Sequence, residues 1–355
     1  ARRDAGFSIF YMGINLGAFI APLIVAPFAD YFGFRAGFFL SGVAISLGTF
    51  QFRFTRKLLG DAGLHPHPST EGELKRNWKL FWGGLVALAI LGGLALGGVF
   101  TFDAAELARV LGAVTVGLAL YFFGYVMLFG HLDKAQMKRV GVIAVFFVAA
   151  AIFFAGFEQA SSTFNLFARD YTDRSFLGSW FESGEHPAGL YQSVNPIFII
   201  LLAPAFAWFW MFLAKRNLEP SAPAKFALGL IQLGLGFAVM AFAANLAVQA
   251  DEVLPTWLLL TYLLHTTAEL CLSPIGLSNV TKLAPKQYVS QMMGTWFMGV
   301  SLGNLIAGVL GGHVGGADIT EMPSAFWTMT WIGVVSGVLL LAATPLLKKM
   351  MGGVR

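Results

Sequence analysis

Ten stretches of this chain are apolar and long enough to cross a lipid bilayer, and they constrain the fold more than any other feature. A membrane helix needs about 20 apolar residues, because the hydrocarbon core is about 30 Å thick. Backbone polar groups in hydrocarbon must find partners within the chain, so such stretches form helices. The sequence therefore predicts an all-α polytopic membrane protein. The predicted spans are 7–28, 37–54, 80–102, 110–128, 140–168, 192–213, 226–249, 256–283, 289–314 and 325–347.

Composition supports a membrane-embedded chain. Of its 355 residues, 57% are hydrophobic and only 12% are charged, about half the charged fraction of a soluble domain. Short amphipathic strands of the kind that build outer-membrane barrels are absent from the sequence, which favours a helical bundle. The single cysteine, Cys271, excludes a disulfide framework and a cysteine-based metal site.

The distribution of Lys and Arg predicts the orientation. Cytoplasmic loops of membrane proteins carry an excess of these residues. If both ends of the chain are cytoplasmic, only four of the 23 Lys and Arg residues fall outside: Arg35, Arg109, Arg169 and Arg174. The formal charge of +4 then reflects topology and gives no reason to expect a nucleic-acid partner.

Two carboxylates, Glu158 and Glu269, lie inside predicted spans. A charge at the centre of a membrane helix costs about 2.5–3.5 kcal/mol even on the mildest scale, so such groups usually face a polar cavity and have a function there. Polar residues follow Glu158, which suggests that the outer half of its helix lines water. Glu269 shares a helix face with Thr266 and Ser273, at spacings of three and four. The alternative for both is a permanently hydrogen-bonded packing role.

Other polar or aromatic side chains in the spans allow two interpretations each. Asn15 and Asn195 could bind a peptide backbone or a carboxylate, and they could equally join two helices. Trp296 could line a pocket or pack. His265 is a lone histidine one turn before Glu269. Such a residue is more often a packing group than a proton relay, and we assign it no role.

No nucleotide-binding loop, metalloprotease motif or hydrolase motif occurs in the sequence. We therefore expect a transporter driven by an ion gradient, and neither an enzyme nor a cofactor-dependent protein. The proton is the expected coupling ion.

Five motifs in series resemble the proton-coupled oligopeptide transporter family of the major facilitator superfamily. Phe10-Tyr-Met-Gly-Ile-Asn-Leu-Gly17 is similar to the signature F-Y-x-x-x-N-x-G of that family's fifth helix. The other four motifs, in family order, resemble the seventh, eighth, tenth and eleventh helices; they are residues 157–168, 191–196, 269–274 and 292–296.

This resemblance implies a partial major facilitator fold. Residues 1–55 would be the last two helices of the N-terminal bundle, and 56–79 a cytoplasmic linker. Residues 80–130 would be the helix pair that bacterial members insert, and 139–350 the six-helix C-terminal bundle. The family's first four helices, with an E-x-x-E-R motif and a lysine, have no counterpart, so we expect a fragment of a longer protein.

The resemblance also implies site roles. Asn15 and Asn195 would contact a peptide, Glu269 would bind its ammonium group, and Trp296 would line the pocket. Glu158 would serve proton coupling and the extracellular gate. We include Ser273 among the substrate-binding residues.

The expected function is proton-coupled symport of di- and tripeptides by alternating access, carried out by a monomer in a bacterial inner membrane. One alternative is a relative that carries an amino acid, nitrate or a drug-like molecule. Less favoured alternatives are a polytopic membrane enzyme and a scaffold or sensor without transport activity.

Overall fold

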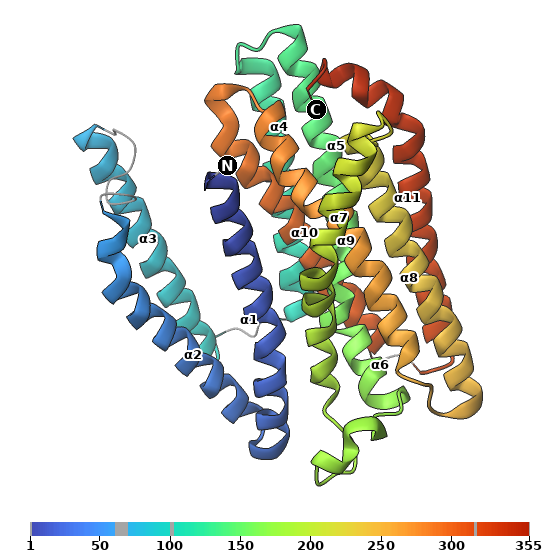
Figure 1. Cartoon of the computed structure of the whole chain (residues 1–355). Coiled ribbons are helices and arrows are strands. Elements are labelled where there is room, and N and C mark those ends of the chain that lie inside the picture. The colour runs from blue at the N-terminus through green and yellow to red at the C-terminus, as the bar shows by residue number, and fades with distance from the viewer. Residues whose placement is uncertain (1, 61–69, 100–102, 316–317, 355) are drawn as a thin grey trace. The chain divides into compact units, whose positions relative to one another are not determined.

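Helices dominate the computed structural model, which describes residues 2–60, 70–99, 103–315 and 318–354. The chain divides into two units, each described by itself. One consists of Ala1–Tyr31 with Ala108–Arg355, and the other is Phe32–Leu107. Residues 61–69 of the predicted linker lie outside the described residues. The helices (Figure 1) are α1 (Arg2–Phe32), α2 (Phe34–Thr55), α3 (Glu71–Leu96), α4 (Ala104–Phe129), α5 (Lys134–Phe157), α6 (Thr163–Tyr171), α7 (Val194–Lys215), α8 (Ala222–Ala250), α9 (Thr256–Leu283), α10 (Val289–Gly315) and α11 (Met322–Met351).

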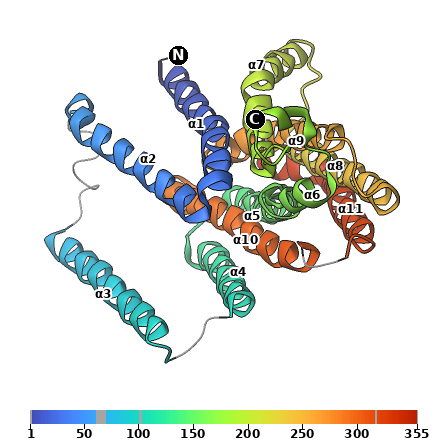
Figure 2. The ribbon, with the colours of Figure 1, turned by 90° about the horizontal axis from the view of Figure 1, so that it is seen from below.

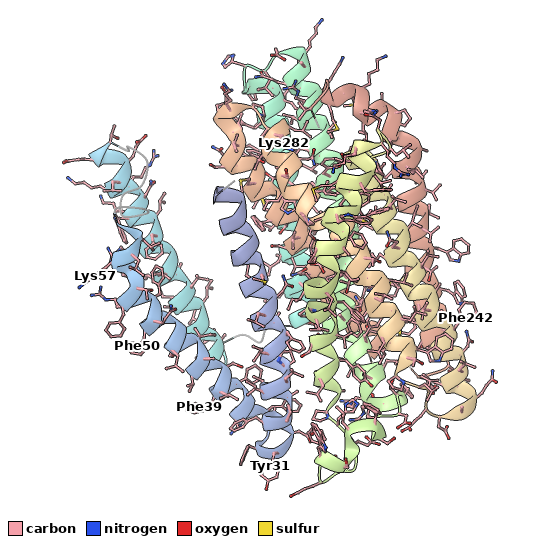
Figure 3. All side chains as sticks on the ribbon, in the orientation of Figure 1. Tyr31, Phe39, Phe50, Lys57, Phe242 and Lys282 are labelled. Carbon is pink, nitrogen blue, oxygen red and sulfur yellow. The ribbon has the colours of Figure 1, made fainter. Side chains whose placement is uncertain are left out.

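Each predicted span contains a helix, and the largest shift is in α3. This helix is Glu71–Leu96 where 80–102 was predicted, so it begins inside the predicted linker 56–79. Residues 100–102 of the predicted span lie outside the described residues. Nine segments in the described part of the chain are long and apolar enough to cross a membrane, against ten expected. The difference is α2, which forms as predicted but carries Arg35, Gln51 and Arg53, and these lower its mean hydropathy. Large apolar side chains such as Phe39, Phe50 and Phe242 are exposed (Figure 3), as expected of surfaces that face lipid.

The predicted span 140–168 is present as one membrane-spanning segment, Lys134–Tyr171, but its helix is interrupted. Helix α5 ends at Phe157, a single 3₁₀ turn follows over Glu158–Ser161, and α6 begins at Thr163. The backbone of Ser162 is not helical, with φ −115° and ψ −88°. No proline causes this break. Instead, short polar side chains form local hydrogen bonds that compete with the helical ones.

The core of the larger unit lies among α5, α8, α9, α10 and α11, which Figure 2 shows from below. Close approach of helix backbones through glycines holds these helices together, as is usual where lipid removes the hydrophobic drive for association. A Cβ at Gly234 of α8 would lie 2.8 Å from the carbonyl oxygen of Thr330 on α11. His265 is buried between α8 and α9, where its Nε2 lies 3.1 Å from the carbonyl oxygen of Leu233. Its Nδ1 is buried without a hydrogen-bond partner among the described residues.

Two glycine pairs on α10 have different surroundings. Gly299 and Gly303 face α5, and a Cβ at Gly303 would lie 2.6 Å from the Cβ of Phe154. A Cβ at Gly308 or Gly312 would meet nothing within 4 Å in the described part of the chain. Only the first pair therefore forms a helix–helix contact here.

We predict that Gly303→Val destabilises the protein while Gly308→Val has a much smaller effect. Both changes have the same cost in helix propensity, but only the first forces α10 away from α5, at about 1–3 kcal/mol. Thermal unfolding in detergent measures both. Equal losses of stability in the two variants would contradict this packing.

Candidate functional site

Asn195, in the first turn of α7, joins that helix to α9. Its Nδ2 donates to Oε2 of Glu269 at 3.1 Å and lies 3.0 Å from Oγ1 of Thr266. The Thr266 hydroxyl itself donates to the carbonyl oxygen of Tyr262, at 2.7 Å. The expected shared face of Thr266 and Glu269 therefore exists, and the Asn195 amide holds the carboxylate in a fixed position.

Glu158 lies at the C-terminus of α5, where the helix stops. Its side chain is half-buried, and no described residue forms a hydrogen bond or ion pair with its carboxylate. The ring of Phe157, the preceding residue, lies 6.5 Å from the ring of His265 on α9, the helix that carries Glu269. The two predicted acids therefore lie on segments that contact each other.

Gln159 stabilises the helix break next to Glu158. Its Nε2 donates to the carbonyl oxygens of Ala155 (3.2 Å) and Ala307 (3.1 Å), the latter on α10. Its Oε1 accepts from the hydroxyls of Thr163 (2.6 Å) and Ser162 (3.3 Å). Gln159 is only 1% exposed. The interpretation that this stretch lines water is therefore wrong for Gln159 and Thr163, which satisfy each other inside the protein.

Two further residues hold the break and were not singled out from the sequence. The carbonyl oxygen of Ala160 accepts from Nε2 of Gln192 at 2.6 Å and from the Tyr262 hydroxyl at 3.5 Å. The roles of Gln192 and Tyr262 could not be predicted from the sequence. The carbonyl of Ala160 is available to them only because the helix is interrupted there.

Trp296 and Ser273 have unlike surroundings. The Trp296 ring is buried against α9, where a Cβ at Gly276 would lie 2.1 Å from it, and it packs edge-on against Phe226 at 5.9 Å. In this structure Trp296 thus forms helix contacts. Ser273 Oγ is buried without a hydrogen-bond partner among the described residues, as is Asn165 Oδ1.

Asn15 is buried on α1, one turn before Phe19. The carbonyl oxygen of Phe19 accepts from Ser193 Oγ at 2.7 Å. A Cβ at Gly189 would also lie 2.8 Å from the Cβ of Ala26. Helix α1 therefore contacts the segment Ala188–Ser193 that leads into α7 and Asn195.

The connection between α6 and α7 is held by Arg174. Its guanidinium donates to the carbonyl oxygens of His186 (2.7 Å) and Arg169 (3.2 Å), and it forms an ion pair with Glu185. An isolated β-bridge between Thr172 and Val253 fastens the same connection to the α8–α9 turn. Among the described residues, no group of three His, Cys, Asp or Glu side chains could hold a metal ion.

His186 is buried in this connection, outside the predicted spans. Burial lowers its pKa below the ordinary value of 6.5, and the Arg174 guanidinium lowers it further. The Pro187 carbonyl, Glu185 and Asp173 act in the opposite direction without cancelling the effect. The folded connection therefore binds a proton less readily than an unfolded one, and its stability is complete above about pH 6.5 and falls as the pH drops below that value.

We predict that hydrogen exchange of residues 172–193, corrected for intrinsic rates, is faster at pH 5 than at pH 7.5. His186→Gln retains a hydrogen-bond donor without a titrating group, so it should remove most of this difference. The exposed His131 gives a matched control, because His131→Asn should leave the difference intact. Identical exchange of the wild-type segment at both pH values would contradict the assignment.

Comparison with known proteins identifies the class. A model of the POT family matches residues 1–328. The chain is 37% identical to the peptide transporter YePEPT of Yersinia enterocolitica subsp. palearctica serotype O:3 (strain YE-P4), over 99% of the chain and 69% of that relative. It is 30% identical to a di-/tripeptide transporter of Lactococcus lactis subsp. lactis (strain IL1403), over 100% of the chain and 71% of that relative.

A solved structure agrees with these sequence matches. The crystal structure of peptide transporter POT in complex with sulfate aligns with a TM-score of 0.85 at 37% identity, over 99% of this chain and 70% of that one. The fold is therefore that of a membrane transporter of the major facilitator superfamily. The chain belongs to the POT family, as its motifs predicted.

Proposed function

We propose that this chain is part of a proton-coupled symporter of di- and tripeptides that works by alternating access. One observation carries the proposal. Two membrane carboxylates lie on contacting segments of a POT family chain. Asn195 holds Glu269, and no described residue forms a hydrogen bond with the Glu158 carboxylate. The relatives named as peptide and di-/tripeptide transporters support the same cargo.

A peptide would bind to Glu269 and Asn195, the part of the site that hydrogen bonds hold in place. The Glu269 carboxylate is a partner for a peptide ammonium group, since charge-assisted hydrogen bonds are the strong ones. The Ser273 hydroxyl and the Asn195 amide would bind the peptide backbone near that group. Asn15 would contribute from α1, and Trp296 would form a wall of the pocket.

The proton would bind the carboxylate of Glu158, which no described residue hydrogen-bonds. Glu158 lies at a helix break, so a small rearrangement of the 3₁₀ turn changes its surroundings. Inward proton movement is worth about 2.3 kcal/mol per charge at 100 mV, enough to drive moderate accumulation of a neutral peptide. Proton binding at Glu158 would favour the outward-open state.

We further propose the organisation that the family pattern implies. Residues 1–55 would belong to the N-terminal bundle and 139–350 to the C-terminal bundle, with 56–79 as a cytoplasmic linker and 80–130 as an inserted pair. Both ends of the chain would face the cytoplasm of a bacterial cell, and the protein would work as a monomer, without a cofactor and without chemical conversion of its cargo.

Glu158→Gln should abolish uptake driven by a proton gradient, by at least tenfold, and leave peptide exchange intact. The substitution retains size and removes the titrating group. Full-length protein in liposomes, with a labelled dipeptide, provides both measurements. Glu182→Gln, at an exposed position of the α6–α7 connection, is the control and should behave as wild type. Gradient-driven uptake by Glu158→Gln at the wild-type rate would remove Glu158 from the coupling.

Glu269→Gln tests the cargo. Its amide oxygen can still accept from Asn195, but the charge that would attract an ammonium group is lost. Wild type should prefer a dipeptide over its N-acetylated form by at least tenfold, and the variant should lose most of that preference. Uptake of an amino acid, nitrate or drug-like molecule without any dipeptide uptake would assign another cargo, and no transport of any panel member would favour a scaffold or sensor.

A further inference from the structure

The first turns of α3 carry cations and tryptophans on one helix face. Lys75, Trp78, Lys79 and Trp82 are spaced by three, four and seven residues, so they lie along one side of the helix. An apolar run begins directly after Lys79, at Leu80. The charged part of this face therefore lies where the helix enters hydrocarbon.

Three aromatic rings support one another on this part of α3. The Trp78 and Trp82 rings are stacked, with centroids 6.4 Å apart at 21°. Phe81 packs edge-on against both, at 5.7 and 5.5 Å. All three side chains are more than half exposed, between 53% and 59%. Exposed tryptophans at a membrane boundary are typical of residues that sit at the level of lipid headgroups.

The neighbouring cations Lys75, Arg76 and Lys79 form no ion pair with a described residue. Two acids, Glu71 and Glu73, also lie in the first turn of α3. Of these, Glu73 accepts from the backbone amide of Thr70 in a capping box. Lys and Arg residues immediately beside a membrane helix attract anionic lipids.

The length of the face fits a lipid headgroup. At 1.5 Å per residue, Lys75 and Trp82 are about 10 Å apart along the helix axis. The headgroup region on each side of a bilayer is about 5–7 Å thick, so this distance reaches from the phosphates to the top of the hydrocarbon. Cations then lie level with the phosphates, and the indole rings lie just below them.

We propose that this face of α3, formed by Lys75, Trp78, Lys79 and Trp82, binds an anionic phospholipid together with the adjacent Arg76. The ammonium and guanidinium groups bind the phosphate, and the indoles lie against the glycerol and the start of the acyl chains. The site gives the predicted inserted helix pair a membrane anchor. It is independent of the peptide and proton sites, so failure of either proposal leaves the other standing.

Lipid binding to the full-length, delipidated protein in detergent tests the site. Dioleoylphosphatidylglycerol and dioleoylphosphatidylcholine are titrated separately, and native mass spectrometry counts the bound molecules. We expect the triple variant Lys75→Gln, Arg76→Gln, Lys79→Gln to lose at least tenfold in affinity for phosphatidylglycerol and little for phosphatidylcholine. These side chains are exposed, so thermal unfolding should be unchanged.

A second triple variant separates a local site from net charge. Lys134, Lys348 and Lys349 are also exposed and have no nearby tryptophan cluster, so their replacement by Gln removes the same charge elsewhere. This control should bind phosphatidylglycerol within twofold of wild type. Equal losses in the two variants, no loss in either, or competition by inorganic phosphate as strong as that by the lipid would overturn the proposal. Trp78→Ala with Trp82→Ala should weaken binding of both lipids.

Discussion

The four hydrogen bonds of the Gln159 amide are the interaction on which the functional part of this chain depends. Hydrocarbon offers no water to a broken helix, so each backbone group freed at the 3₁₀ turn must find a partner in the protein. Gln159 bonds Ala155 within its own helix and Ala307 on α10, and it accepts from the two hydroxyls that follow. The Gln159 amide therefore joins the break to the folded core.

The side chains of the two acids differ in how strongly the protein fixes them. Glu269 projects from an uninterrupted part of α9 and is bonded by Asn195, so it presents a charge at a constant place. Glu158 lies on the break itself, and its carboxylate has no bond from a described residue. A group that binds a substrate benefits from pre-organisation, whereas a group that loads and releases a proton must be able to change its surroundings. The two positions suit these two roles.

Features that depend on residue type alone could be predicted from the sequence. Contacts between helices that are distant in the sequence could not. The apolar runs predicted ten helical segments, and the cost of charge in a membrane singled out Glu158 and Glu269. Hydropathy cannot register the helix break, because Gln159 acts through Ala307, distant in the sequence. Trp296 can likewise be buried only because Gly276, on another helix, has no side chain in its way. The partners of Asn195 could not be predicted either, because they lie on another helix.

The two units are stabilised in different ways, and the membrane explains why both suffice. In the larger unit, Gly234 and Gly303 let backbones approach so closely that packing fixes the positions of the helices. The first turns of α3 carry cations and indole rings directly before an apolar run. Residues of this kind act together with packing against neighbouring helices to set the depth and rotation of a membrane helix. If the proposed lipid site exists, the face of Lys75, Trp78, Lys79 and Trp82 would contribute to the position of α3 in the bilayer.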